Sequence, residues 1–180
     1  MRGGGRTDSQ VIGRRFLRRA APLVALAIVA ALQAWRGCRF EPPPANLPEG
    51  DFRVERVVDG DTLLLTTGAR VRLIGVDTPE TVKPDHPVEP WGPEATAFTR
   101  TFIAAGKVRL QFDQERVDQY NRLLAYVWVG DKLLNEELLR AGLARQERGY
   151  HYSQAMKTRF RRAEREARDA HRGLWSDAEP

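Results

Sequence analysis

The stretch FRVERVVDGDTLLLTTGARVRLIGV, residues 52–76, sets the fold of this 180-residue chain. Within it, residues 52–59, 62–67 and 70–76 are rich in valine and leucine and alternate with polar residues, which favours β-strands. Turns that contain glycine or aspartate separate the three segments. Three strands joined so closely predict a meander.

The sequence after this stretch predicts two more strands and three helices. A proline-rich loop covers residues 78–90, and the strands are expected at 107–113 and 122–129. The helices are expected at 92–106, 133–142 and 153–173, each closed by a glycine. Leu174 and Trp175 are expected to pack the last helix end onto the core. This order predicts an α+β domain built on a small closed barrel of five strands.

The N-terminal part has a different composition. Residues 1–19 form a basic tail, and residues 20–35 are apolar without a charge, a pattern typical of an export signal. The apolar run is shorter than the roughly 20 residues that a spanning helix needs. It predicts an uncleaved membrane anchor, which we favour slightly, or a cleaved signal peptide, and a buried helix is the alternative. Either export route places the domain outside the cytoplasm, in the periplasm, at the cell surface or secreted.

A proline-rich linker is expected at residues 36–50, the folded domain at 51–176 and a short tail at 177–180. Cys38 is the single cysteine, so an intrachain disulfide is excluded. Residues 1–50 hold eight arginines and three acids, whereas the other 130 residues hold 21 basic and 21 acidic side chains. The formal charge of +5 therefore belongs to the tail and is no evidence for nucleic-acid binding by the domain. The arginine-rich segment 157–172 is either a solvated face with ion pairs, which we favour, or a contact for a polyanion.

Charged residues gather where the first strands end. Arg72 lies in an apolar strand, and Asp77, Thr78 and Glu80 follow at its end, while Asp61 begins the neighbouring strand. A turn of this kind can direct two carboxylates and a backbone carbonyl at one point, and such oxygen ligands suit Ca²⁺ or Mg²⁺. The three histidines are scattered, so no zinc site is expected. From spacing alone, a cation site and an ordinary capped turn both remain open.

Several motifs resemble the staphylococcal nuclease (thermonuclease) family, over roughly residues 52–175. They are VVDGDTLLL, RLIGVDTPET, GPEATAF, DQYNRLLAYVWV, LLNEELLRAGLA and a terminal LW. The resemblance implies an OB-fold barrel with three α-helices. It also implies Ca²⁺-dependent hydrolysis of phosphodiesters in DNA and RNA, with products that carry 3′-phosphate and 5′-hydroxyl ends. We further expect a monomer that prefers single-stranded or unwound substrates.

The resemblance assigns a role to individual residues. It implies Asp61, Asp77 and the carbonyl of Thr78 as calcium ligands, Arg72 and Arg122 as catalytic arginines, and Glu80 as the general base or water-orienting group. It implies Tyr120, Tyr150 and Tyr152 as nucleotide contacts, the last two by an ambiguous local match. The chain departs from the family pattern at Gln119, Asn121 and Leu123, where the family has a lysine and two glycines.

A non-catalytic nucleic-acid or peptide-binding module of the same fold is the alternative, because fold alone does not decide function. The complete set of two arginines and three acids favours the enzyme.

Overall fold

The quoted stretch forms three antiparallel strands in a computed structural model, which describes residues 47–81 and 88–176. They are β1 (Gly50–Asp59), β2 (Thr62–Leu65) and β3 (Arg70–Leu73). β1 pairs with β2, and β2 pairs with β3. The predicted meander is therefore confirmed.

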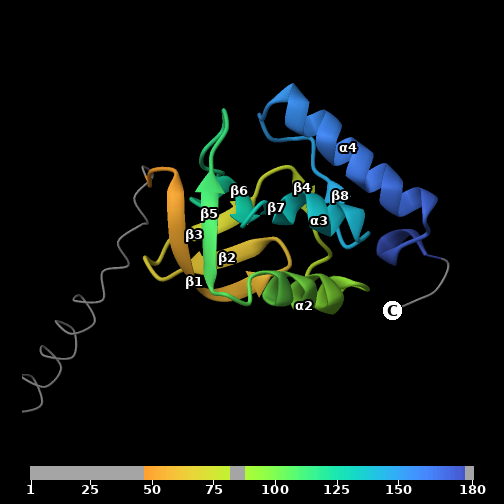
Figure 1. The fold of residues 1–180 in the computed structure, drawn as a ribbon, viewed down its shortest axis with the longest axis horizontal. Coiled ribbons are helices and arrows are strands. Elements are labelled where there is room, and N and C mark those ends of the chain that lie inside the picture. The colour runs from red at the N-terminus through yellow and green to blue at the C-terminus, as the bar shows by residue number, and fades with distance from the viewer. Residues whose placement is uncertain (1–46, 82–87, 177–180) are drawn as a thin grey trace, which may run out of the picture. The chain divides into compact units, whose positions relative to one another are not determined.

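Two later strands close the barrel (Figure 1). β5 (Lys107–Gln111) pairs antiparallel with the first half of β1 and with β6 (Leu123–Val129). β6 in turn runs parallel to β3, with Arg72 opposite Leu124. Each of the five strands thus has two neighbours, which confirms the five-stranded OB-type barrel.

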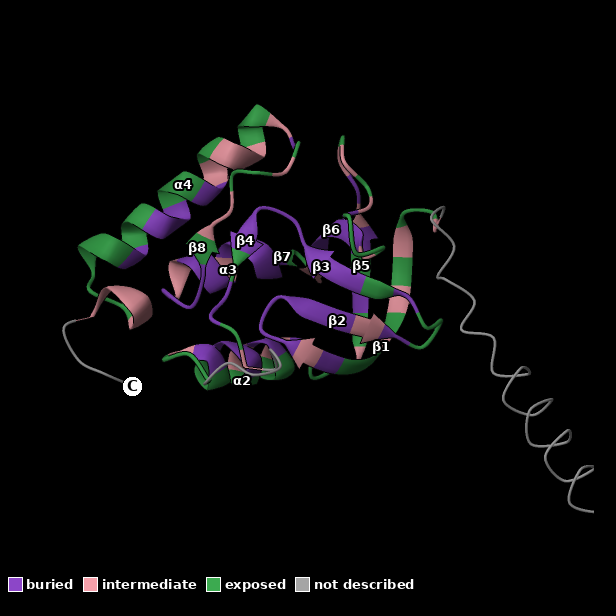
Figure 2. Ribbon diagram, turned by 180° about the vertical axis from the view of Figure 1, so that it is seen from behind, coloured by how far each residue is buried: buried purple, intermediate pink, exposed green. Residues whose placement is uncertain are grey.

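The barrel interior is filled by the apolar positions that the sequence pattern predicts. Leu63, Leu65, Val71, Leu73 and Leu110 are fully buried. Figure 2 shows the buried residues running along β2 and β3 and as a stripe on one side of α4 (Gln154–Asp169). Since the other side of α4 is exposed, this helix packs with one face only.

The predicted third strand, 70–76, is wrong in its second half. β3 ends at Leu73, and Val76–Asp77 form a separate strand, β4, which pairs with β8 (Arg145–Gln146). Between them Gly75 has φ of +77°, and a Cβ there would lie 2.8 Å from ring atoms of both Tyr152 and Phe160. A strand cannot continue through this conformation, so the chain turns and carries Asp77 out of the barrel wall.

The three helices are confirmed, although each of them ends earlier than predicted. α2 (Gly92–Phe102) stops before Gly106, and α4 stops at Asp169, four residues before Gly173. His171 at φ of 50° ends α4 instead, because the amide of Arg172 donates to the carbonyl of Ala167 at 3.0 Å. α3 (Leu134–Arg140) ends two residues before Gly142, with Ala141 as its cap residue. The preceding β7 (Lys132–Leu133) was not expected from the sequence.

The folded domain begins before residue 51. The side chain of Glu49 accepts a hydrogen bond from the amide of Phe112 at 2.9 Å, and the carbonyl of Leu47 accepts one from Arg116 at 2.7 Å. Residues 47–50 of the predicted linker therefore belong to the domain. The predicted tail 1–19, signal or anchor 20–35 and tail 177–180 lie outside the described residues, and export stays a prediction. Within 47–81 and 88–176, no helix is long and apolar enough to cross a membrane.

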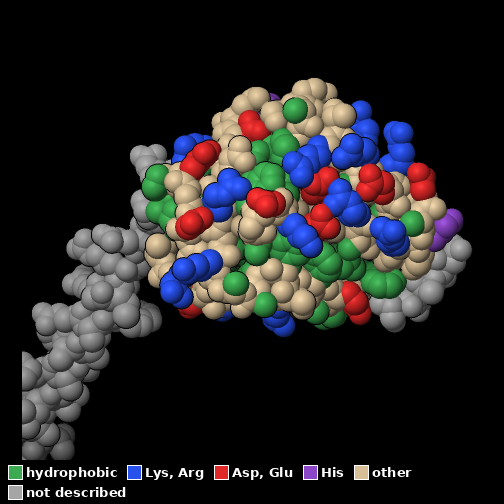
Figure 3. Space-filling model, in the orientation of Figure 1, with side chains coloured by type: hydrophobic (Ala, Val, Ile, Leu, Met, Phe, Trp, Pro, Cys, Tyr) green, Lys and Arg blue, Asp and Glu red, His purple; other side chains and the backbone are tan. Residues whose placement is uncertain are grey.

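Surface charges of both signs are interspersed on the face shown in Figure 3. On α4, Arg162 pairs with Glu166 at 3.6 Å and Arg168 with Glu164 at 3.4 Å. The ion-pair interpretation of segment 157–172 is thus confirmed for these residues. Arg161 and Arg165 form no ion pair with any described residue.

Asn135 fastens α3 to the barrel and to the turn that precedes β4. Its side chain is fully buried, accepts from the amide of Val127 at 3.0 Å and donates to the carbonyl of Ile74 at 2.9 Å. We expect Asn135→Ala to lower the free energy of unfolding by about 3 kcal/mol, because two buried backbone groups lose their partner. Urea denaturation measures this, and Gln114→Ala, at an exposed position, is the matched control. Equal midpoints for the two variants would contradict this function of Asn135.

Candidate active site

Arg72 joins two acids at the open end of the β2–β3 pair. Its Nη2 lies 2.6 Å from Asp77 Oδ1, and its Nη1 pairs with Asp61 Oδ2. The side chains of Arg72 and Asp61 are each only 8% exposed, whereas that of Asp77 is 53% exposed. One buried guanidinium therefore bridges a buried carboxylate and a solvent-facing one.

Thr78 is held against the same carboxylate. Its amide and Oγ1 donate to Asp61 Oδ2 at 2.9 and 3.0 Å. The chain can approach this closely because Gly60 precedes Asp61: a Cβ on Gly60 would lie 2.8 Å from Thr78 Oγ1. This contact fixes the backbone that leads from β4 to Glu80.

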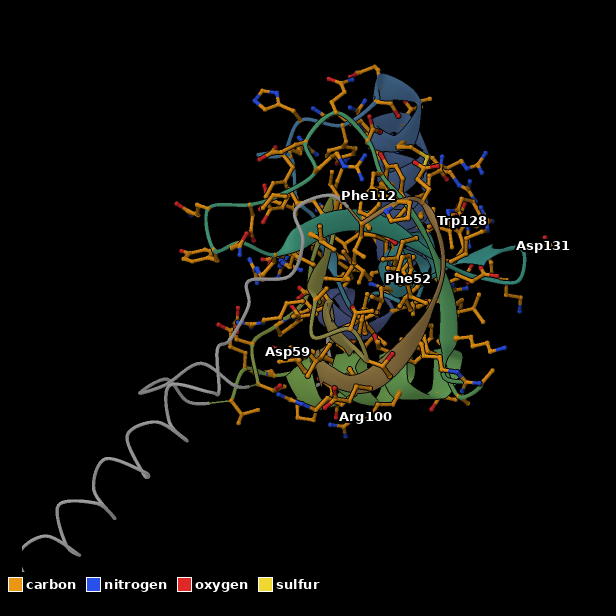
Figure 4. All side chains as sticks on the ribbon, turned by 90° about the vertical axis from the view of Figure 1, so that its left-hand side faces the viewer. Phe52, Asp59, Arg100, Phe112, Trp128 and Asp131 are labelled. Atoms are coloured by element: carbon orange, nitrogen blue, oxygen red, sulfur yellow. The ribbon has the colours of Figure 1, made fainter. Side chains whose placement is uncertain are left out.

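Asp59 positions the loop that carries Glu80. Its buried carboxylate accepts from the Oγ1 groups of Thr81 at 2.8 Å and Thr96 at 3.2 Å. In Figure 4, Asp59 lies on the side of the barrel that faces α2. The sequence pattern marked this aspartate only as part of a turn, and its function depends on threonines far along the chain. The Glu80 side chain itself is exposed.

Arg122 is oriented by Asp118, a second residue that the sequence did not single out. The carboxylate of Asp118 accepts from Arg122 Nε at 2.6 Å and from its amide at 2.9 Å. Between them, Asn121 has φ of 58°, a left-handed conformation that asparagine tolerates better than most residues. Asn121 can therefore adopt the turn that brings the amide of Arg122 to the carboxylate of Asp118. The spacing of four residues between an acid and an arginine was the available signal.

The parallel pairing of β3 with β6 brings the two arginines to one side. Arg72 lies opposite Leu124, and Arg122 is two residues before Leu124, so both side chains belong to the same face of the sheet. Tyr150 lies within electrostatic reach of both guanidiniums. Burial raises the pKa of the Tyr150 hydroxyl, and the two arginines oppose that rise.

The three predicted nucleotide tyrosines have different surroundings. Tyr120 is 68% exposed, and the Arg122 guanidinium lies 5.3 Å from its ring centroid. Tyr120 and Tyr150 line a cavity of about 250 Å³ with Asp118. Tyr152, by contrast, is 3% exposed and packs on Phe160, and its hydroxyl donates to the carbonyl of Glu147 at 2.8 Å. The structure places Tyr152 in the core, so the predicted nucleotide contact at this residue is not retained.

The acids of the site outnumber the cation that they share. Burial raises the pKa of Asp77, and Asp61 adds to the rise while Arg72 opposes it. Burial also raises the pKa of Glu80, with Asp59, Asp61 and Asp77 adding to it. Burial lowers the pKa of Arg72, but Asp61 and Asp77 outweigh this and keep it raised, so the guanidinium stays charged. The unbalanced negative charge suits a further cation.

The donor atoms available to such a cation are all oxygens. The carboxylates of Asp61 and Asp77 and the carbonyl of Thr78 have the chemistry that a hard divalent ion prefers. In the part of the chain that the structure describes, no three His, Cys, Asp or Glu side chains form a group that could hold a metal ion. Ions of this class commonly complete their coordination with water and substrate oxygens, so the donor set fits a partial site.

Known proteins resemble the chain over this region and beyond. The model of the family described as "Staphylococcal nuclease homologue" matches residues 70–177. The thermonuclease of Staphylococcus hyicus is 41% identical over 136 residues, 74% of this chain and 80% of that protein. The thermonuclease of Staphylococcus intermedius is 43% identical over 139 residues, 76% and 82% of the two chains. Endonuclease YncB of Bacillus subtilis is 39% identical over 127 residues, 68% of this chain and 60% of that protein. The chain therefore belongs to the staphylococcal nuclease homologue family.

Proposed function

We propose that the protein is a Ca²⁺-dependent nuclease that hydrolyses phosphodiester bonds in DNA and RNA. One observation carries the proposal: Arg72, which lies in β3 and pairs with Asp61 and Asp77, is one strand away from Arg122, which directly precedes the parallel strand β6, and alternation along the strands places both side chains on one face. Two guanidiniums so placed can donate paired hydrogen bonds to a single phosphate. The names thermonuclease and endonuclease of the relatives support the same activity.

Arg72 and Arg122 would stabilise the charge that develops on the phosphate oxygens in the transition state. Donors held in place before the reaction are effective because they need no reorganisation. Arg72 is held by two carboxylates and Arg122 by Asp118, so both guanidiniums are oriented without a ligand.

Glu80 would take a proton from the attacking water, or orient it. The raised pKa of its carboxyl brings its basicity closer to what a general base needs near neutral pH. Water would attack phosphorus as the bond to the 5′-oxygen breaks, and the leaving 5′-oxygen would take up a proton from solvent, which yields 3′-phosphate and 5′-hydroxyl ends. Glu80 is open to a substrate because its side chain is exposed, and Asp59 holds the loop that carries it.

The carboxylates of Asp61 and Asp77 and the Thr78 carbonyl would hold Ca²⁺. When bound, Ca²⁺ would neutralise phosphate charge and orient the attacking water. Arg72 already occupies one oxygen of each acid, so we propose that arginine and cation share the two carboxylates.

A digestion assay tests the proposal. The full chain is incubated with heat-denatured DNA, with Ca²⁺ or with an excess of chelator. We expect digestion with Ca²⁺, with 3′-phosphate ends on the products, and at least a hundredfold slower digestion with chelator, because the charge on the phosphate is then less well neutralised. Binding of the DNA without any Ca²⁺-dependent cleavage would instead support a non-catalytic module of the same fold.

A further inference from the structure

A second cavity, of about 370 Å³, adjoins the candidate active site. Asp77 and Thr78 form part of its wall, so it opens directly beside the proposed calcium ligands. Trp91, Arg145 and Leu174 are among its other lining residues. It shares no lining residue with the cavity of Tyr120 and Tyr150. The two cavities thus adjoin different parts of the site, one the Asp77 side and the other the Arg122 side.

Arg145 is the basic residue of this cavity, whose described lining also includes the acids Asp77 and Glu89. The Glu89 carboxylate accepts a hydrogen bond from the amide of Glu80 at 3.2 Å. Arg145 lies opposite Asp77 in the β4–β8 pair, but the Asp77 carboxylate is bonded to Arg72. Among the described residues, Arg145 has no ion-pair partner, and it is the single cationic side chain of the described cavity lining. A guanidinium without a carboxylate partner is free to bind an anion such as a phosphate.

Trp175 holds Arg145 in place. The Arg145 guanidinium lies 4.6 Å from the Trp175 ring centroid, and that of Arg168 lies 3.9 Å from the same centroid. The short 3₁₀ helix η1 (Gly173–Trp175) that carries this ring is tied to the turn after α3, since the amide of Leu174 donates to the carbonyl of Gly142 at 2.8 Å. The sequence predicted that Leu174 and Trp175 pack a helix end, and the structure adds that Trp175 orients an arginine.

Trp91 supplies an aromatic ring to the same cavity. It is half-buried and has φ of 70°, a conformation that is rare for a bulky residue. Backbone hydrogen bonds on both sides hold Trp91 in this conformation. The amide of Gly92 donates to the carbonyl of Glu89 at 3.0 Å, and the amide of Ala95 donates to the carbonyl of Trp91 at 3.0 Å. Aromatic side chains beside a basic group are typical of sites for single-stranded nucleic acids.

We propose that this cavity is a second nucleotide subsite, in which a base stacks on Trp91 and the phosphate next to the scissile one binds Arg145. The inference rests on the proposed nuclease function and extends it to the substrate. A strand held in both cavities would be gripped on either side of the scissile phosphate. Such a grip suits cleavage within a chain, and it favours single strands because their bases are free to stack.

The test of the subsite is the binding of a 12-nucleotide single-stranded DNA. Its Kd is measured by fluorescence anisotropy in the presence of Ca²⁺. The full chain carries Glu80→Gln so that the DNA is not cleaved. We expect Arg145→Ala to raise Kd about tenfold and to reduce the slope of log Kd against log salt by about 0.7, the value for one phosphate contact on a single strand. Trp91→Ala is expected to raise Kd about tenfold without changing that slope.

Arg100→Ala is the matched control, because it removes one positive charge from the exposed end of α2 (Figure 4) and should change neither quantity. Trp91→Tyr keeps a stacking ring and should retain most of the affinity. If Trp91→Ala does not fold, as judged by circular dichroism, Arg145→Ala decides alone. Wild-type Kd and slope in Arg145→Ala would overturn the subsite. If Arg145→Ala weakens DNA binding but the wild-type chain fails the digestion assay, the subsite stands and the proposed nuclease activity is overturned.

Discussion

Replacement of Arg72 by alanine is expected to reduce both activity and stability. Loss of one preorganised donor to the transition state costs about a hundredfold to a thousandfold in kcat. Asp61 would also be left as a buried carboxylate without its cation, which costs about 3–5 kcal/mol of unfolding free energy. Nuclease assays and urea denaturation measure the two losses. Because Ca²⁺ would compensate the same acids, it should raise the Tm of this variant more than that of the wild type.

Two further variants separate the contributions. Arg72→Lys keeps the charge but not the planar fork, so it should recover most of the stability and little of the activity. Arg70→Ala, on the same strand but exposed, should leave both quantities unchanged. An Arg72→Ala protein with wild-type stability would contradict the bridging function of Arg72, and wild-type kcat would contradict its place in the reaction.

Glu80→Gln is expected to abolish most activity without affecting the fold. Loss of a general base costs about a hundredfold to ten-thousandfold in kcat. The Glu80 side chain is exposed and makes no hydrogen bond to any described residue, so the Tm should stay within about 1 °C of the wild type. Steady-state kinetics on denatured DNA and thermal melts measure the two quantities.

Glu94→Gln is the matched control, since Glu94 is an exposed acid at the start of α2. It should cleave DNA at the wild-type rate. Single-stranded DNA should bind the Glu80→Gln protein as tightly as the wild type, because glutamine removes the proton acceptor and not a phosphate contact. A Glu80→Gln enzyme with wild-type kcat would refute the assignment of Glu80 as the base.

The sequence predicted the barrel well because its information is local. Alternation of apolar and polar residues sets which face of each strand is buried, and five strands were recognised within a few residues of their bounds. The helices were recognised for the same reason. The helix ends were predicted less accurately. Gly173 was expected to end α4, but His171 ends it, in a left-handed conformation.

Contacts between distant segments were decided by the tertiary structure. The turn at Gly75 depends on the rings of Tyr152 and Phe160, more than 70 residues later in the chain. The turn brings Asp77 to Arg72 and places Arg145 opposite Asp77 in the β4–β8 pair. Tyr152 shows the same limit, because its aromatic character fits both a nucleotide contact and the core, and packing against α4 selected the core.

The sequence by itself thus determined the strands, the helices and the residue types at the strand ends, because these follow from periodicity over a few residues. The tertiary structure alone decided that Arg72 bridges Asp61 and Asp77, that Asp118 orients Arg122, and that Trp175 orients Arg145. Each of these contacts forms because closure of the barrel or a turn of the chain brings two side chains together. Strand and helix patterns carry no information on the distance between such side chains.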